Sequence, residues 1–174
     1  MSLAGTKEID NGLEWSSKEQ QEQQFVTDYI TSELRRQGIK DINIKGPYTV
    51  SAGNIEHLRS DISFDLNKKY PLDIAWGLHP TPAVNGVPKE QSTKLIKQIE
   101  LEDSRQDRSL YSGFIGLISQ TSSRLYVNLR CCELTNSNAH IYVGGGYTLQ
   151  SDVDSEWEET ERKSETLTRI FDLL

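Results

Sequence analysis

Positive charge and long apolar runs are both scarce in this sequence. Its 174 residues carry 19 Lys and Arg against 26 Asp and Glu, a formal net charge of −7. Proteins that bind nucleic acid need a basic stripe to replace phosphate counterions, so this balance argues against a nucleic-acid partner. No apolar run approaches the length of a membrane span, and the N-terminus lacks the basic and apolar regions of a signal peptide. We therefore expect a cytoplasmic protein with no membrane partner.

Cysteine is scarce as well. Cys131 and Cys132 are adjacent in a predicted strand, where successive side chains point to opposite faces. Neither a disulfide framework nor a zinc site is indicated. The 35% hydrophobic and 26% charged content is ordinary for a globular protein, and no repeat or linker divides the chain. A single domain over residues 1–174 is the simplest division.

The periodicity of apolar residues and the turn residues predict an α+β fold, with a mostly antiparallel sheet flanked by helices. Residues 1–15 are expected to form an irregular lead-in. The first helix should run from Ser17, a candidate N-cap, to Arg36 and end at Gly38. The other expected elements are strands at 48–51 and 54–66, a helix at 71–78, a loop at 79–88, a helix at 89–99, strands at 112–118, 124–132 and 139–143, and a helix from Trp157 onward.

Two of these helices carry a pair of glutamates three residues apart. In the last helix the apolar line, followed back from Phe171, reaches Glu159 and Glu156. In the first helix the line through Phe25, Val26, Tyr29, Ile30 and Leu34 leads back to Glu22 and Glu19. An unpaired buried carboxylate is costly, so a positive partner is expected: Lys163, or a divalent cation. The last helix alone is also explained by a solvated acidic first turn, but two such pairs favour a hard cation such as Mg²⁺.

A series of short motifs resembles the chorismate-utilising enzyme family, which includes isochorismate, anthranilate, aminodeoxychorismate and salicylate synthases. Each motif is weak alone, but the set follows the family's order and covers nearly the whole chain. The motifs are LAGT at Leu3–Thr6, KExxE at Lys18–Glu22, HL at His57-Leu58, HPTPAVNGVP at His79–Pro88, LYSGFIG at Leu110–Gly116, a strand arginine at Arg130, three glycines at Gly144–Gly146, and SEWEETERK at Ser155–Lys163.

The resemblance implies roles for particular residues. Glu22 and Glu159 would bind Mg²⁺, with Glu19 and Glu156 behind them or acting through water. Tyr111, Arg130 and the backbone N–H groups near Gly144 and Gly146 would hold a carboxylate of the substrate, chorismate, with Lys163 on the same side. Gly5, Thr6 and His57 would line the ring pocket. Without the resemblance, Arg130 reads as a surface or ion-paired residue, Tyr111 as core packing and the glycines as an ordinary turn.

Ala83 distinguishes the branches of the family. The isochorismate synthases, which add water, resemble the HPTPA form found here, whereas threonine tends to replace the alanine in the other branches. The small side chain leaves space for a nucleophilic water, so the resemblance favours isochorismate synthase. Two alternatives stay open: an ammonia- or lyase-type relative, and a non-catalytic module that binds chorismate or metal.

The chain also departs from the family pattern. Gln23 stands where histidine is usual. Members are usually more than twice as long, and their general base, a lysine, and general acid, a glutamate, lie upstream of LAGT, so no catalytic residue is assigned here. The expectation is the C-terminal portion of a longer enzyme, inactive alone and open to self-association through exposed sheet edges. The sequence leaves open whether the product serves menaquinone or siderophore biosynthesis.

Overall fold

The computed structural model describes residues 2–8, 14–52 and 55–171, with the backbone alone at 3–8, 52, 55 and 103. The chain forms two compact units, Met1–Lys94 and Leu95–Leu174, and each is described by itself. The α+β class with antiparallel strands is confirmed. Whether the chain is one domain, as the sequence predicts, stays a prediction. Within the described ranges no helix is both long and apolar enough to cross a membrane.

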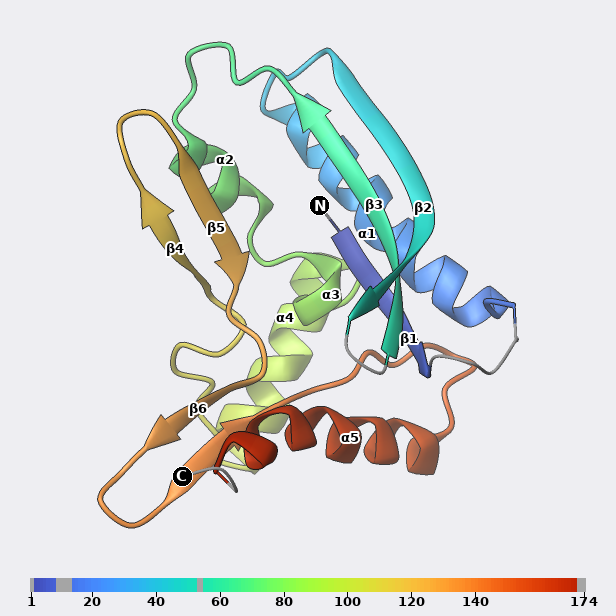
Figure 1. The fold of residues 1–174 in the computed structure, drawn as a ribbon, viewed down its shortest axis with the longest axis vertical. Helices are drawn as coiled ribbons and strands as arrows, with labels where there is room; N and C mark the ends of the chain where they lie inside the picture. The colour runs from blue at the N-terminus through green and yellow to red at the C-terminus, as the bar shows by residue number, and fades with distance from the viewer. Residues whose placement is uncertain (1, 9–13, 53–54, 172–174) are drawn as a thin grey trace. The chain divides into compact units, whose positions relative to one another are not determined.

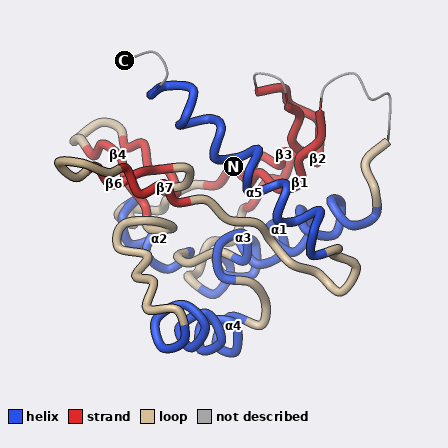
Figure 2. Tube along the Cα trace, turned by 90° about the horizontal axis from the view of Figure 1, so that it is seen from below, coloured by secondary structure: helices blue, strands red, loops and turns tan. Residues whose placement is uncertain are grey.

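The first unit is a three-stranded antiparallel sheet, ordered β1-β3-β2, with α1 packed along it (Figures 1 and 2). Residues 2–8 were expected to be irregular, but they form strand β1 because they find a partner in β3. The helix at 71–78 is confirmed, and the loop at 79–88 contains a short helix that the prediction missed. The elements are β1 (Ser2–Glu8), α1 (Ser17–Arg36), β2 (Ile42–Ala52), β3 (Ile55–Phe64), α2 (Pro71–Leu78), α3 (Pro82–Asn85) and the start of α4 (Lys89–Lys97).

Local signals at both ends explain the bounds of α1. The N-cap is Ser16, one residue before the predicted cap, and its hydroxyl accepts from the Lys18 N–H at 3.2 Å. At the other end Gly38 has φ of 85°, and its N–H donates to the Arg35 carbonyl at 2.9 Å. Glycine adopts this left-handed conformation without penalty, which ends the helix.

The hydrophobic core of the first unit lies between α1, the sheet and α2. Its buried members are Val26, Ile30, Leu34, Ile39 and Ile74, with Phe64 and Ile62 among the residues packed against them. Val26, Ile30 and Leu34 recur every four residues and so form one face of α1. Phe25, which the sequence placed on this face, is 40% exposed. The buried position one turn before Val26 and Thr27 belongs to Gln23 rather than Glu22.

The second unit is built from two separate antiparallel hairpins and a helix. A π-helical turn (η1, Gln98–Asp103) follows α4. The helix predicted to end at residue 99 is therefore α-helical only as far as Lys97. The other elements are β4 (Phe114–Ile118) paired with β5 (Ser123–Val127), β6 (Cys131–Leu134) paired with β7 (Ala139–Tyr142), and α5 (Val153–Phe171).

The strand predicted at 124–132 is in fact two strands. Past β5 the Asn128 N–H donates to the Gly113 carbonyl at 2.8 Å, and the Leu129 N–H turns back to the Val127 carbonyl at 3.1 Å. Arg130 then has a left-handed φ of 50°, which no strand tolerates. The predicted Thr135–Asn138 turn does join β6 to β7, through a bond of 2.8 Å from the Thr135 N–H to the Asn138 carbonyl.

Helix α5 begins four residues before its predicted start at Trp157. The Asp152 carboxylate accepts from both the backbone N–H and the hydroxyl of Ser155, each at 2.9 Å, which caps the helix there. These donors hold the pKa of Asp152 below its ordinary value, because they stabilise the ionised carboxylate. Of the described side chains in this unit only Glu156 is buried, and Leu117, at 79% exposed, is typical of the apolar surface on the hairpins.

We predict that Leu34→Ala, which empties a fully buried position of α1, lowers the free energy of unfolding by about 2–5 kcal/mol. Leu72→Ala in the same unit is the control, since Leu72 is 41% exposed and should lose less than about 1 kcal/mol. Urea unfolding followed by circular dichroism measures both. Equal losses in the two variants would contradict this account of the core.

Candidate functional site

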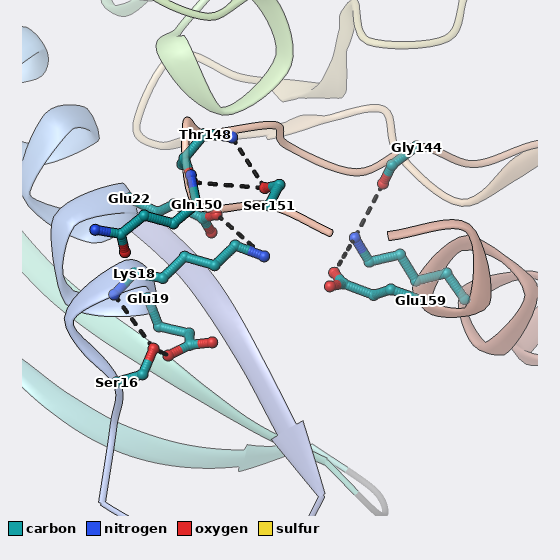
Figure 3. Close-up of polar contacts among 10 residues, drawn as sticks. Ser16, Lys18, Glu19, Glu22, Gly144, Thr148, Gln150, Ser151 and Glu159 are labelled. Atoms are coloured by element: carbon teal, nitrogen blue, oxygen red, sulfur yellow. Dashed lines mark hydrogen bonds and ion pairs between the residues drawn. The ribbon is translucent and has the colours of Figure 1, made fainter. Parts of the chain in front are cut away.

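The first turn of α1 carries the KExxE motif. The Ser16 hydroxyl donates to the Glu19 carboxylate, which completes a capping arrangement with the Lys18 N–H (Figure 3). Glu22 lies one turn further on, half-buried, and its carboxylate is 3.9 Å from the Lys18 ammonium. The two glutamates predicted to face the buried line are therefore partly exposed. Glu19 supports the helix start, and Glu22 makes a long ion pair with Lys18.

Gln23 is the residue of this turn that faces inward. It is 1% exposed, and its side-chain NH₂ donates to the hydroxyls of Ser2 on β1 and Ser60 on β3, at 2.9 and 3.0 Å. Buried amides are retained where they find such partners. Because these bonds tie α1 to two strands, they fix the rotation of the helix and with it the direction of Glu22. Sequence reasoning noted Gln23 only as a departure from the family pattern.

The predicted ring-pocket residues of this unit come from β1 and β3. Thr6 is the cross-strand partner of His57, and the register shifts between Ala4 and Thr6, at Gly5. An extra residue of this kind is a β-bulge, and it decides which residues face one another beyond it. The side chain of Thr6 lies outside the described residues, so its predicted contact with a ligand stays a prediction. His57 is half-buried.

Ala83 lies on α3, the short helix within the predicted loop. Thr81 precedes the helix, and its carbonyl accepts from the N–H groups of Val84 and Asn85 at 3.1 and 3.0 Å. The Ala83 side chain is exposed. The loop is thus an ordered segment that presents a small apolar side chain.

In the second unit, α5 meets the glycine segment through charged groups. The Lys163 ammonium is 2.7 Å from the Glu159 carboxylate and donates to the Gly144 carbonyl at 2.9 Å (Figure 3). Glu156, one turn before Thr160, is 2% exposed, and a Cβ added at Gly145 would lie 3.5 Å from its Oε2. The two glutamates and the lysine therefore lie on one face of α5, as the sequence predicted, although only Glu156 is fully buried.

The glycine segment itself differs from the predicted turn. Gly144, Gly145 and Gly146 are irregular backbone without a turn of their own, and none has a positive φ. A Cβ at Gly144 would be 2.7 Å from the Tyr111 hydroxyl, so a larger residue there would force the Tyr111 side chain to shift. A turn follows at Thr148, whose N–H donates to the Ser151 hydroxyl at 3.0 Å and leads into α5 (Figure 3).

Tyr111 is held by residues that the sequence did not single out. Its ring stacks on Tyr142 at 5.8 Å between centroids, and the Arg108 guanidinium lies 5.9 Å from its centroid. Arg108 is in turn held by Glu100 through two bonds of 2.5 and 2.7 Å. Burial raises the pKa of the Tyr111 phenol, and the nearby Arg108 offsets part of the rise. The hydroxyl therefore remains a proton donor at neutral pH.

Arg130 is the predicted anchor for a substrate carboxylate. It follows β5 in the break between strands rather than lying on a strand, and its side chain is half-buried. Within the part of the chain that the structure describes, no hydrogen bond or ion pair joins its guanidinium to another residue. A forked cation in this state is suited to a carboxylate ligand.

The donor chemistry of both helices fits a hard cation. Glu22 and the pair Glu156 and Glu159 offer carboxylate oxygens, and Mg²⁺ commonly uses one or two protein carboxylates. Among the described residues no group of three His, Cys, Asp or Glu side chains is gathered as a complete metal site. Glu22 and Glu159 belong to different units, so their convergence stays a prediction.

The fold defines the chain as an α+β protein with two carboxylate-bearing helices. A family model described as "Chorismate binding enzyme" matches residues 2–172, and the chain therefore belongs to this family. The resemblance seen in the motifs is thus confirmed.

The most similar relatives include three isochorismate synthases. Isochorismate synthase EntC of Escherichia coli (strain K12) is 28% identical over 169 residues, which are 96% of this chain and 42% of that protein. Isochorismate synthase MenF of Haemophilus influenzae is 27% identical, and the match covers 98% of this chain and 41% of that protein. The chloroplastic isochorismate synthase 2 of Arabidopsis thaliana is 33% identical, and the match covers 95% of this chain and 29% of that protein. The chain thus spans well under half the length of these relatives.

Solved structures agree on the fold. MenF, the menaquinone-specific isochorismate synthase from Escherichia coli, superposes with a TM-score of 0.81 at 26% identity, over 95% of this chain and 40% of that one. DhbC from Bacillus anthracis gives a TM-score of 0.83 over 99% of this chain and 49% of its own. At 23% identity the second likeness supports the fold alone.

We predict that Gly144→Ala displaces Tyr111, because the new methyl would lie 2.7 Å from its hydroxyl, and that it lowers the free energy of unfolding by about 1–3 kcal/mol. Near-ultraviolet circular dichroism should change as the stack with Tyr142 is disturbed. Gly146→Ala is the matched control, since nothing lies within 4 Å of a Cβ at that position. The close approach would be refuted by wild-type spectra and stability in both variants.

Proposed function

We propose that this chain supplies the metal-binding and carboxylate-recognition portion of an isochorismate synthase. The reaction is the Mg²⁺-dependent conversion of chorismate to isochorismate, by addition of water at C2 with loss of the C4 hydroxyl. The observation that carries the proposal is the cluster in which Lys163 joins Glu159 to the Gly144 carbonyl, beside the buried Glu156. The names of the relatives that match nearly the whole chain support the choice of reaction.

In this proposal the protein's own residues bind and orient a dianion. Glu22 and Glu159 would hold the metal, which when bound would neutralise charge on one carboxylate and on the departing hydroxyl. Glu19 and Glu156 act behind them. Arg130 forks onto the other carboxylate, and the Tyr111 hydroxyl and Lys163 donate on the same side. Backbone N–H groups at Gly144 and Gly146 complete this recognition.

The ring of the substrate would lie against residues of the first unit. We assign Gly5, Thr6 and His57 to this pocket, since β1 and β3 bring Thr6 and His57 into register. Ala83, small and exposed on α3, would leave room for the attacking water. A threonine there would occupy that volume, which separates this proposal from an ammonia- or lyase-type relative.

A non-catalytic module that binds chorismate or metal is the alternative from another class. Detectable turnover would exclude this alternative, whereas binding without turnover fits both readings. We also propose a location in the cytoplasm, and the choice between menaquinone and siderophore biosynthesis stays open.

Self-association belongs to the proposal as well. The two hairpins of the second unit carry exposed apolar side chains, among them Ile115 at 61%, Leu117 at 79% and Tyr126 at 60%. Surface of this kind, together with unpaired strand edges, favours pairing with another chain. Sedimentation velocity over a range of protein concentrations would measure it.

We predict that Glu22→Ala and Glu159→Ala each weaken Mg²⁺-dependent chorismate binding at least tenfold, because each removes a carboxylate from the proposed metal site. Calorimetric titration with Mg²⁺, with chorismate and with both measures the effect. Glu158→Ala is the matched control, since this neighbour's side chain is 71% exposed. Wild-type affinity in Glu22→Ala and Glu159→Ala would contradict the assignment.

We also predict that the purified chain turns over chorismate negligibly, because it supplies no assigned group for proton transfer. A linked assay with an isochorismate-consuming enzyme measures the product. A complete isochorismate synthase added to the same mixture verifies that the linked enzyme responds. Isochorismate formed by the chain alone, above the background with boiled protein, would refute the prediction.

A further inference from the structure

The segment 79–88, which carries Ala83, is attached to its surroundings at both ends. At its C-terminal end the buried Asn85, 7% exposed, donates from its side-chain NH₂ to the Lys89 carbonyl at 3.0 Å. Its side-chain oxygen accepts from the Thr93 hydroxyl at 2.9 Å. Both partners lie on α4, so these bonds dock the end of α3 on the first turns of that helix.

At the other end of the segment the His79 N–H donates to the Ala75 carbonyl at 3.0 Å, and the Lys89 side chain adds a second attachment. The Lys89 ammonium donates to the His79 carbonyl at 3.0 Å and to the Tyr29 hydroxyl of α1 at 2.9 Å. It also lies 5.5 Å from the centroid of the Tyr29 ring, within the range of a cation–π contact. Lys89 therefore joins three elements: α4, the start of the segment and α1.

Hydrogen bonds from an ammonium are stronger than those between neutral groups, and Lys89 is half-buried, so solvent screens them less than at an open surface. Tyr29 follows Glu22 by seven residues on α1, which is about two turns and the same side of the helix. The lysine thus links the helix that carries Glu22 to the segment that carries Ala83.

We propose that Lys89 is a positioning residue that holds the Ala83 segment in place against the Glu22 helix. The role deepens the proposed function and rests on it, because a segment in fixed register with α1 presents Ala83 at a constant place beside the substrate. Loss of the ammonium leaves the helices intact and weakens the attachment of the segment at its N-terminal end. Ligand affinity then falls because binding must first order the segment.

Amide hydrogen exchange tests the attachment directly. In Lys89→Met, which keeps the length of the side chain, we expect exchange at Val84, Asn85 and Gly86 to become at least tenfold faster, since these amides form the internal bonds of the segment. The Leu34 amide in the core of α1 should keep its rate, which separates local release from a general loss of stability. Lys94→Met, on the exposed face of the same helix, is the control and should change neither.

His79 provides a second readout. Burial and the positive charge of Lys89 both hold the pKa of this imidazole below its ordinary value. Removal of the charge in Lys89→Met should raise the pKa of His79, whereas Lys89→Arg, which retains charge and donors, should keep it low. The histidine resonances in a pH titration by NMR report the shift, and Lys89→Arg also shows whether a charged donor restores slow exchange.

Chorismate titration completes the experiment. We expect Lys89→Met to weaken binding at least fivefold and Lys89→Arg to recover most of the affinity. The attachment is overturned if the three amides exchange at the wild-type rate in Lys89→Met. The positioning role is overturned if they exchange faster but chorismate binds as tightly as before. A wild-type chain that binds no chorismate would instead refute the proposed function, while the exchange data would still decide the attachment.

Discussion

The packing of α1 on the β1-β3-β2 sheet is the constraint on which the first unit depends. Leu34 and its apolar neighbours supply the buried area, but apolar packing alone tolerates small rotations of a helix. The Gln23 amide removes this freedom, because its bonds to Ser2 and Ser60 require one orientation. The same helix carries Glu22 outward and Tyr29 toward Lys89. The directions of both side chains are thus set by one buried arrangement.

The second unit is organised differently, since charge rather than apolar area lies at its centre. Glu156 is its buried side chain among the described residues, and the apolar side chains of the hairpins are largely exposed. Paired charges define direction well but contribute little net stability once desolvation is counted. The Glu100–Arg108 pair and the stack of Tyr111 on Tyr142 likewise orient side chains. The contacts of the second unit therefore fix the orientation of a few polar side chains.

Much of the fold could be predicted from sequence wherever the signal is local. The first helix and the helix at 71–78 have the predicted bounds, since a serine cap, a proline at the first turn and a terminating Gly38 act within a few residues. Strand β1 was missed because it exists only through its pairing with β3. The break before Arg130 was missed because no turn residue marks the left-handed backbone at Arg130, which follows the bond from the Leu129 N–H to the Val127 carbonyl.

In the candidate site, too, the features with a local sequence signal could be predicted and those that depend on distant partners could not. The face of α5 that carries Glu156, Glu159 and Lys163 follows from helical spacing alone. The burial of Gln23, and the roles of Arg108 and Lys89 in holding other residues, depend on partners far along the chain that no local pattern marks. Glu19 and Glu22 at the start of α1 were predicted to face the buried side, because the apolar line was drawn through Phe25. The buried face begins one position later, at Val26, and leads back to Gln23.

One consequence follows from the way Lys163 divides its bonds. Its single ammonium serves two acceptors, the Glu159 carboxylate and the Gly144 carbonyl, which belong to different segments of the second unit. Both bonds come from one ammonium, so a ligand that displaced the Lys163 side chain would remove it from the helix carboxylate and from the loop carbonyl at the same time. Helix α5 and the glycine segment therefore share one cation, and they keep it or lose it together.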